Sequence, residues 1–387
     1  MKFNAEGRIP SLDGVRAVSI VCVVVSHLAF VLAPRQSSMA ADSSMLDWVK
    51  HQVLAALLLG DLGVQMFFVL SGFLITLLLT EEVARTGTVN LGRFYVRRTL
   101  RIFPAYYAYL AVIIALVTIG AIDVPWSNLL ASLTYTSNYC VGCGAGDRWY
   151  VAHSWSLAVE EQFYLLWPAA LVLLGARRGV LGVGLVLVIC PLLRGWYQWT
   201  TGDVNVGFRR FELVADSLAT GCLLALLRVR LHSSSSYPRI LASRGFVLVP
   251  VSVLLLTQLA KHPSIHSPFL FVLVWRTWMN VAIAMCIDWS MVHADGRIGR
   301  VLNQRTVARV GVLSYSIYLW HMPFLDPFGT LIVHRFPVNL VFIAAAAALS
   351  YYVVERPILR MRPSVERRVF DGRPVHHVPL NQLGQGS

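Results

Sequence analysis

Charged side chains are scarce in this chain of 387 residues. Asp, Glu, Lys and Arg make up 14% of it, and only three of the 33 basic residues are Lys. Soluble domains carry about a quarter charged residues, and 56% of this chain is hydrophobic. These proportions exclude an ordinary soluble domain and predict a polytopic membrane protein.

Several catalytic motifs are also missing. The sequence has no HxxxD, no GxSxG and no phosphate-binding P-loop, so a serine-hydrolase nucleophile is not expected. The six cysteines include one isolated CxxC, Cys140 and Cys143. A zinc site needs two further ligands at suitable spacing, and no metal site is predicted. A disulfide and two idle thiols both remain open for this pair.

Ten apolar runs are long enough to cross a bilayer, starting near residues 15, 53, 103, 156, 179, 211, 245, 269, 310 and 337. We therefore predict an all-α, multi-pass bundle of about ten helices in the cell membrane. Lys and Arg concentrate at the termini and in every second loop, which places both termini in the cytoplasm. Residues 1–361 form the expected membrane domain, and residues 362–387 are expected to be a disordered basic tail.

The net charge of +13 does not indicate nucleic-acid binding, because the basic residues lie between apolar runs instead of forming a patch. They report membrane topology and are compatible with an anionic ligand.

The first apolar run contains Arg16 and His27, eleven residues apart and therefore on one helical stripe, roughly 16 Å apart along the axis. Ionisable groups inside a membrane span generally face the interior and mark a functional path. A neutral imidazole can accept a proton from a hydroxyl, so His27 is predicted to be a catalytic base. Arg16 could serve a ligand or could simply extend to the lipid headgroups.

An arginine-rich segment, GRFYVRRTLRIFP, precedes the third run. Arg98 and Arg101 are three residues apart and share a helix face, and planar guanidinium groups suit phosphate binding. The alternative is a cluster that sets topology and contacts anionic lipid. Combined with a histidine at membrane depth, the cluster favours a coenzyme A thioester, whose nucleotide is polyanionic and whose pantetheine arm is long.

Polar residues also mark the fourth and ninth runs. Glu160, seven residues after His153, could orient a histidine, hold an acceptor hydroxyl or pair with an arginine such as Arg16 or Arg276. His321 is a second candidate for catalysis, although aromatic and histidine residues near a membrane boundary often form an interfacial belt. Contacts with substrate are expected from His153, Trp155, Tyr318 and His321.

Six ordered blocks between about residues 8 and 357 resemble the integral membrane acyltransferase-3 family. They are RIPSLDGVRA…SH, VQMFFVLSGFLIT, FYVRRTLRIFPAYY, HSWSLAVEEQFYLLWP, VGVLSYSIYLWHMP and LSYYVVERP. The resemblance implies a ten-helix bundle that uses cytoplasmic acyl-CoA to O-acylate sugars and small molecules. It also implies that Arg16 and His27 form the family's Arg-x10-His signature, that Arg98 and Arg101 serve the donor, and that Glu160 is the glutamate of its WSLxxEE block.

The chain departs from the family at Asp216, which lacks the Arg often found two residues earlier; Val214 stands there. The absence of an extracytoplasmic hydrolase-like domain argues against transfer to envelope polymers, and the compact form resembles enzymes that acylate macrolide antibiotics. We expect a short acyl group to move from acetyl-CoA or propionyl-CoA to a hydroxyl of a sugar or small molecule. A transporter or flippase that uses the same charges as a proton relay is the alternative.

Overall fold

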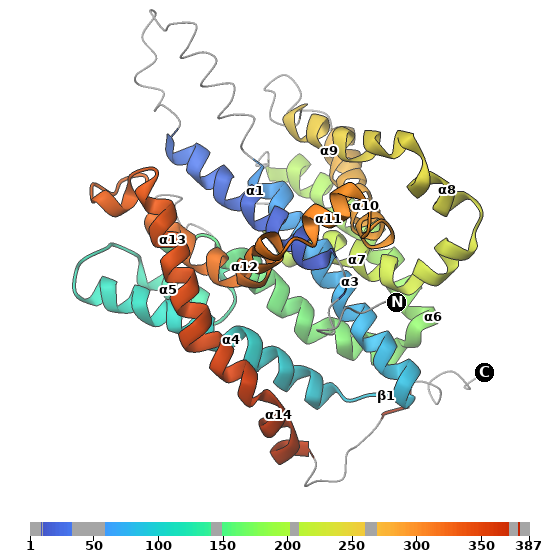
Figure 1. Ribbon diagram of the computed structural model, residues 1–387, viewed down its shortest axis with the longest axis horizontal. Coiled ribbons are helices and arrows are strands. Elements are labelled where there is room, and N and C mark those ends of the chain that lie inside the picture. The colour runs from blue at the N-terminus through green and yellow to red at the C-terminus, as the bar shows by residue number, and fades with distance from the viewer. Residues whose placement is uncertain are drawn as a thin grey trace, which may run out of the picture.

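The structure is a computed structural model that describes residue 9 and residues 11–32, 59–140, 149–201, 209–259, 269–370 and 378–379. Helices dominate this part of the chain (Figure 1). The strands described there are two residues long and form one antiparallel pair, β1 (Thr88–Val89) with β2 (Val378–Pro379). The all-α class predicted from the sequence is therefore confirmed.

Five stretches among the described residues are long and apolar enough to cross a membrane, and a sixth is a pair of helices bent by 71°. The predicted count of ten spans is not established by this measure. The five stretches contain α1 (Leu12–Leu32), α3 (Gly60–Thr86), α4 (Leu91–Thr118), α6 (Ser154–Thr201) and the continuous rod of α13 (Val338–Leu349), a π-helical segment η8 (Ser350–Glu355) and α14 (Arg356–Phe370).

The remaining helices include three of spanning length and several short ones. The bent pair joins α8 (Ser236–Ala242) to η5 (Arg244–Val247) and α9 (Leu248–Leu259). The others are α5 (Trp126–Leu133), η2 (Ser137–Tyr139), η3 (Trp149–Val151), α7 (Phe211–Ser233), α10 (Phe269–Val292), α11 (Arg297–Leu302), α12 (Arg305–Phe324) and η7 (Ile332–His334).

Three of the predicted runs are bounded differently in the structure. The run expected to start near residue 53 is helical from Gly60, and residues 53–58 lie outside the described residues. Gly60 and Asp61 begin α3, and Asp61 in the first turn suits the positive end of the helix dipole. The runs near 156 and 179 belong to α6, which is broken at Gly175, where φ is 73°.

The C-terminal boundary also differs from the prediction. Helix α14 continues to Phe370, past residue 362, where the disordered tail was expected to begin. Glu366 explains this extension, because its carboxylate accepts hydrogen bonds from Arg97 on α4 and from Arg362 one helical turn away. Figure 1 shows α14 running beside α4. Residues 371–377 and 380–387 of the predicted tail lie outside the described residues.

Glycines allow the central helices to approach closely. A Cβ on Gly72 of α3 would lie 1.9 Å from the Leu218 carbonyl oxygen of α7, and one on Gly221 would lie 1.9 Å from that of Val69. Small residues commonly permit this kind of backbone contact in membranes. The reciprocal pair therefore fixes α3 against α7.

We predict that Gly221→Ala destabilises the protein, whereas Gly184→Ala does not. A methyl group at residue 221 meets the backbone of α3, and such overpacking typically costs about 1–3 kcal/mol. A Cβ at Gly184, also within a helix, meets nothing within 4 Å. Thermal unfolding of the two variants in detergent should show a lower midpoint only for Gly221→Ala. Equal midpoints would contradict the close crossing.

Candidate active site

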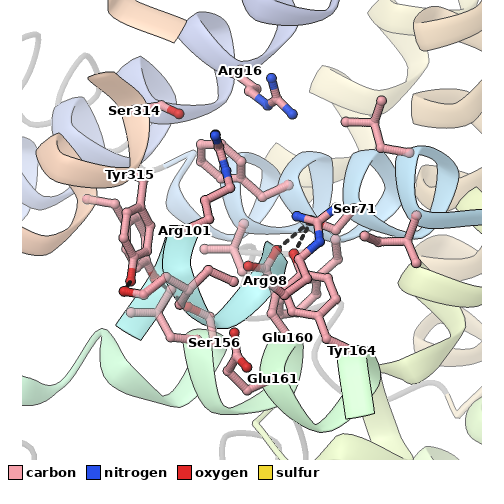
Figure 2. Close-up of a pocket in the computed structure, with 18 residues that line it drawn as sticks. Arg16, Ser71, Arg98, Arg101, Ser156, Glu160, Glu161, Tyr164, Ser314 and Tyr315 are labelled. Atoms are coloured by element: carbon pink, nitrogen blue, oxygen red, sulfur yellow. Dashed lines mark hydrogen bonds between the residues drawn. The ribbon is translucent and has the colours of Figure 1, made fainter. Parts of the chain in front are cut away.

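A cavity of about 120 Å³ lies between α1, α3, α4, α6 and α12, and we call it the inner cavity. Its walls combine apolar side chains with an unusual number of charges. Figure 2 shows Arg16 and Arg101 at one end of the cavity and Glu160 and Glu161 at the other. Such a site, largely apolar with convergent polar groups, is typical of small-molecule binding.

A larger cavity of about 530 Å³, the outer cavity, adjoins the inner one. Arg16, Arg98 and Arg101 line both of them, so these three guanidinium groups stand at the junction. Arg98 and Arg101, which were predicted to share a helix face, both line this space. Further charged residues around the outer cavity are Asp13, Glu82, Arg85, Arg97, Glu355 and Arg362.

The three junction arginines differ in how they are held. Arg16 donates a hydrogen bond of 2.7 Å to Asp13, one turn earlier in α1. The Arg98 guanidinium lies over the ring of Tyr164, 5.0 Å from its centre, an arrangement that stabilises a partly desolvated cation. Within the described residues, neither Arg98 nor Arg101 makes an ion pair with a carboxylate. Both can therefore accept an anionic ligand.

Glu160 joins a short chain of hydroxyl groups in the inner cavity. Ser71 of α3 donates to the Glu160 carboxylate at 2.8 Å, and Tyr164 donates to Ser71 at 3.1 Å. Glu160 thus contacts neither a histidine nor an arginine in the described hydrogen bonds, and its role in holding the hydroxyl of an acceptor stays a prediction. Residues Ser71, Ser156, Glu161 and Tyr164 were not selected from the sequence, although all lie inside the blocks that carry the resemblance.

Three histidines form a cluster beyond the inner cavity. His27 Nδ1 lies 3.2 Å from His321 Nε2, and the two ring centres are 4.9 Å apart. The ring of His153 lies 5.5 Å from that of His321. His153 and Glu160, which were expected to share a stripe, face different surroundings because α6 begins only at Ser154.

Hydrogen bonds determine which nitrogens carry protons. His321 Nδ1 lies 2.7 Å from the Tyr318 carbonyl oxygen, which can only accept, so this nitrogen donates and His321 Nε2 is an acceptor. His27 Nδ1 faces that acceptor and also the Val23 carbonyl at 3.0 Å. Its proton must therefore be on Nδ1, which leaves the lone pair of His27 Nε2 for chemistry.

Tyr318 separates the inner cavity from the histidines. Its hydroxyl lines the cavity and lies 2.5 Å from Ser156 Oγ, and it donates to the His153 carbonyl at 3.2 Å. Its ring lies 5.4 Å from that of His153 and 5.6 Å from that of His321. Neither cavity includes a histidine among its lining residues.

Trp155, expected to contact substrate, lies elsewhere. Its ring meets the edge of Phe68 with centres 6.1 Å apart, and it packs against the hydrophobic core. It does not line either cavity. The structure therefore gives Trp155 a packing contact, whereas Tyr318 lines the inner cavity.

The missing arginine beside Asp216 is supplied by another helix. Arg194 of α6 makes two hydrogen bonds of 2.8 Å to the Asp216 carboxylate, and both side chains are buried. Asn280 of α10 adds a third contact at 3.3 Å. The pairing gives Asp216 a structural role that local sequence could not reveal, because its partner is 22 residues earlier.

The described residues contain free thiols but no cluster of metal ligands. Within the described ranges, no three His, Cys, Asp or Glu side chains are placed to hold a metal ion. Of the two alternatives left open for the CxxC pair, Cys140 is disulfide-bonded and so is not an idle thiol, whereas Cys143 lies outside the described residues. Free thiols occur at Cys22, Cys190, Cys222 and Cys286.

Known O-acetyltransferases resemble this chain over most of its length. OatA of Staphylococcus aureus, named an O-acetyltransferase, is 25% identical over 92% of this chain. The peptidoglycan O-acetyltransferase OatA of Listeria monocytogenes is 26% identical over 90%, and YrhL of Bacillus subtilis, named provisionally as a peptidoglycan O-acetyltransferase, is 27% identical over 94%. The chain spans 58%, 56% and 57% of these three relatives, respectively.

No solved structure matches the chain significantly. The sequence model of the acyltransferase domain, Acyl_transf_3, matches residues 9–355. That range includes every residue that lines the inner cavity and the histidine cluster. The chain belongs to this family of membrane acyltransferases.

Proposed function

We propose that this protein transfers a short acyl group from acyl-CoA to a hydroxyl group, with His27 as the general base. The observation that carries the proposal is the polar column through the bundle. Guanidinium groups at the cavity junction, of which Arg98 and Arg101 make no described ion pair with a carboxylate, lead to Glu160, then to Tyr318 and finally to the histidine cluster. A donor with an anionic head and a long neutral arm matches this order of groups.

The reaction is a direct displacement. The acceptor oxygen attacks the thioester carbonyl carbon as its proton passes to Nε2 of His27. The new C–O bond forms, the C–S bond breaks, and the coenzyme A thiolate leaves and takes the proton back. His321 would support this role by accepting from His27 Nδ1, which keeps the imidazole in the tautomer that a base requires.

The donor would enter from the cytoplasm. The arginine-rich end of the bundle contains Arg85, Arg97, Arg98 and Arg101, and basic residues concentrate on the cytoplasmic side of membrane proteins. Both termini would then be cytoplasmic. Acetyl-CoA and propionyl-CoA are the donors to test, since the relatives' names indicate acetyl transfer by those proteins.

The acceptor is a hydroxyl on a sugar or a small molecule. Two relatives are named for peptidoglycan, which runs against the expectation from the sequence and makes a cell-wall amino sugar the first acceptor to test. A macrolide is the acceptor suggested by the sequence resemblance, and it belongs in the same assay. Free thiol together with acylated acceptor would distinguish this enzyme from a transporter, which moves a molecule without cleaving a thioester.

We predict that His27→Ala lowers kcat by about 10²–10⁴-fold, the usual contribution of a general base. His293→Ala is a matched control, because His293 also places Nδ1 near the carbonyl four residues earlier but lies outside both cavities. Thiol release by the purified variants with acetyl-CoA and acceptor is the measurement. Full activity of folded His27→Ala would exclude His27 as the general base.

His321→Phe should lower kcat by about tenfold or more while the KM for acetyl-CoA stays constant, because the ring no longer accepts from His27 Nδ1. His321→Gln retains an acceptor oxygen and should recover part of the rate. Steady-state kinetics of the two variants test this separation. A donor KM that rises with an unchanged kcat would assign His321 to binding instead.

Arg98→Glu and Arg101→Glu should each raise the KM for acetyl-CoA by about tenfold or more, because a charge-assisted hydrogen bond contributes roughly 1.5–3 kcal/mol. Arg309→Glu changes an exposed arginine on α12, outside both cavities, and serves as the control. The dependence of rate on donor concentration is measured for each. A KM equal to that of the control would mean that the two arginines contact anionic lipid or set the membrane topology instead.

A further inference from the structure

A third cavity, of about 350 Å³, lies at the turn between α3 and α4, and we call it the rim cavity. It shares Glu82, Arg85 and Arg97 with the outer cavity, so the two spaces are adjacent. The remaining residues around it are Thr86, Thr88, Asn90 and Arg93. Three arginines thus face one carboxylate, Glu82, at a place that the proposed reaction does not use.

The rim arginines extend the line of charge that begins at the cavity junction. Arg93, Arg97 and Arg101 are spaced four residues apart, so they follow one face of α4 over about 12 Å. Arg101 belongs to the junction, whereas Arg93 and Arg97 belong to the rim. An anionic ligand that reaches both places must carry two separated groups of negative charge.

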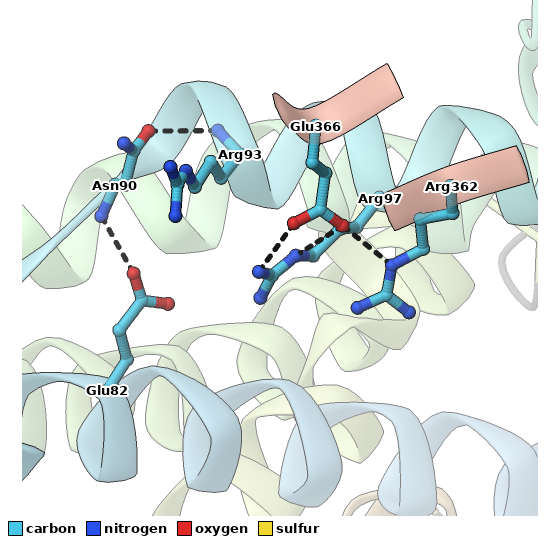
Figure 3. Close-up of polar contacts among 6 residues, drawn as sticks. All are labelled: Glu82, Asn90, Arg93, Arg97, Arg362 and Glu366. Carbon is cyan, nitrogen blue, oxygen red and sulfur yellow. Dashed lines mark hydrogen bonds and ion pairs between the residues drawn. The ribbon is translucent and has the colours of Figure 1, made fainter. Parts of the chain in front are cut away.

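Hydrogen bonds hold the rim in a fixed shape (Figure 3). Asn90 caps α4 by accepting from the Arg93 amide at 2.9 Å, and its own amide donates to Glu82 at 3.0 Å. The single carboxylate of the rim is therefore already engaged with the backbone. The start of α4 adds the positive end of a helix dipole to this space.

Glu366 fixes the orientation of Arg97 (Figure 3). Its Nε and Nη2 donate to the two oxygens of Glu366 at 3.0 and 2.7 Å, and Arg362 donates to the same carboxylate at 2.8 Å. Two guanidinium groups share one negative charge, so the cluster keeps a positive charge. Arg85 donates from Nε to the Glu81 carbonyl at 3.3 Å, and the described ion pairs do not include it.

We propose that the rim cavity binds a phosphate monoester. Resting on the proposed function, this group is the ribose 3′-phosphate of the acyl-CoA donor, whose diphosphate would lie against Arg98 and Arg101. The 3′-phosphate and the diphosphate of the donor then each meet one of the two groups of arginines. The rim would make the enzyme select coenzyme A thioesters over donors that carry the pantetheine arm alone.

The test compares acetyl-CoA with acetyl-dephospho-CoA, which lacks only the 3′-phosphate, using the full chain in neutral detergent. Wild type should prefer acetyl-CoA by about tenfold or more in kcat/KM. Arg85→Ala and Arg97→Ala should each reduce this preference. Arg85 makes no described ion pair, so its variant avoids the loss of the Glu366 contact. Arg239→Ala, an exposed arginine of α8, should keep the full preference.

Three results would overturn the inference. They are equal use of the two donors by wild type, a preference that survives both arginine substitutions, and an effect of those substitutions seen only in vesicles containing anionic lipid. The last result would assign the rim to a lipid phosphate.

A binding measurement separates this inference from the reaction itself. Calorimetry with coenzyme A and dephospho-coenzyme A needs no turnover. Tighter binding of coenzyme A that depends on Arg85 supports the rim site even if no acyl group is transferred. Turnover of both donors with equal binding refutes the rim site and leaves the acyl transfer intact.

Discussion

Guanidinium groups placed within a helical bundle set the main constraint on this structure. Charged groups at membrane depth are costly unless they face an interior space or a partner. Arg98 meets this requirement through the ring of Tyr164, and Arg16 meets it through Asp13. Both also face cavities instead of the outer surface of the bundle. The cavities and the arginines therefore depend on each other.

The close helix crossings explain how the cavity walls are positioned. Gly72 lets α3 touch the backbone of α7, and the preceding residue, Ser71, points about 100° away around the helix. This rotation brings Ser71 to Glu160 on α6. A helix held by backbone contact has little freedom to rotate, so one glycine pair fixes the orientation of a hydroxyl in the site.

The sequence predicted the helical class, the stripe that joins Arg16 to His27, and the common face of Arg98 and Arg101, because these follow from local periodicity. It could not predict that His27 pairs with His321, since 294 residues separate them and the contact depends on how α1 packs against α12. The Arg194–Asp216 pair could not be predicted either, because it depends on how α6 packs against α7. The extension of α14 past residue 362 was missed because its polar composition resembles a tail, and Glu366 reverses that only through Arg97.

The position of Tyr318 places a requirement on the proposed reaction. A thioester in the inner cavity meets this side chain before it meets the histidines, so the ring must move or the arm must pass beside it. Two hydrogen bonds hold the hydroxyl, to Ser156 and to the His153 carbonyl. Each is worth about 0.5–1.5 kcal/mol net, which is small beside the binding energy available from several phosphate contacts. Donor binding can thus supply the free energy that brings the thioester past Tyr318 to His27.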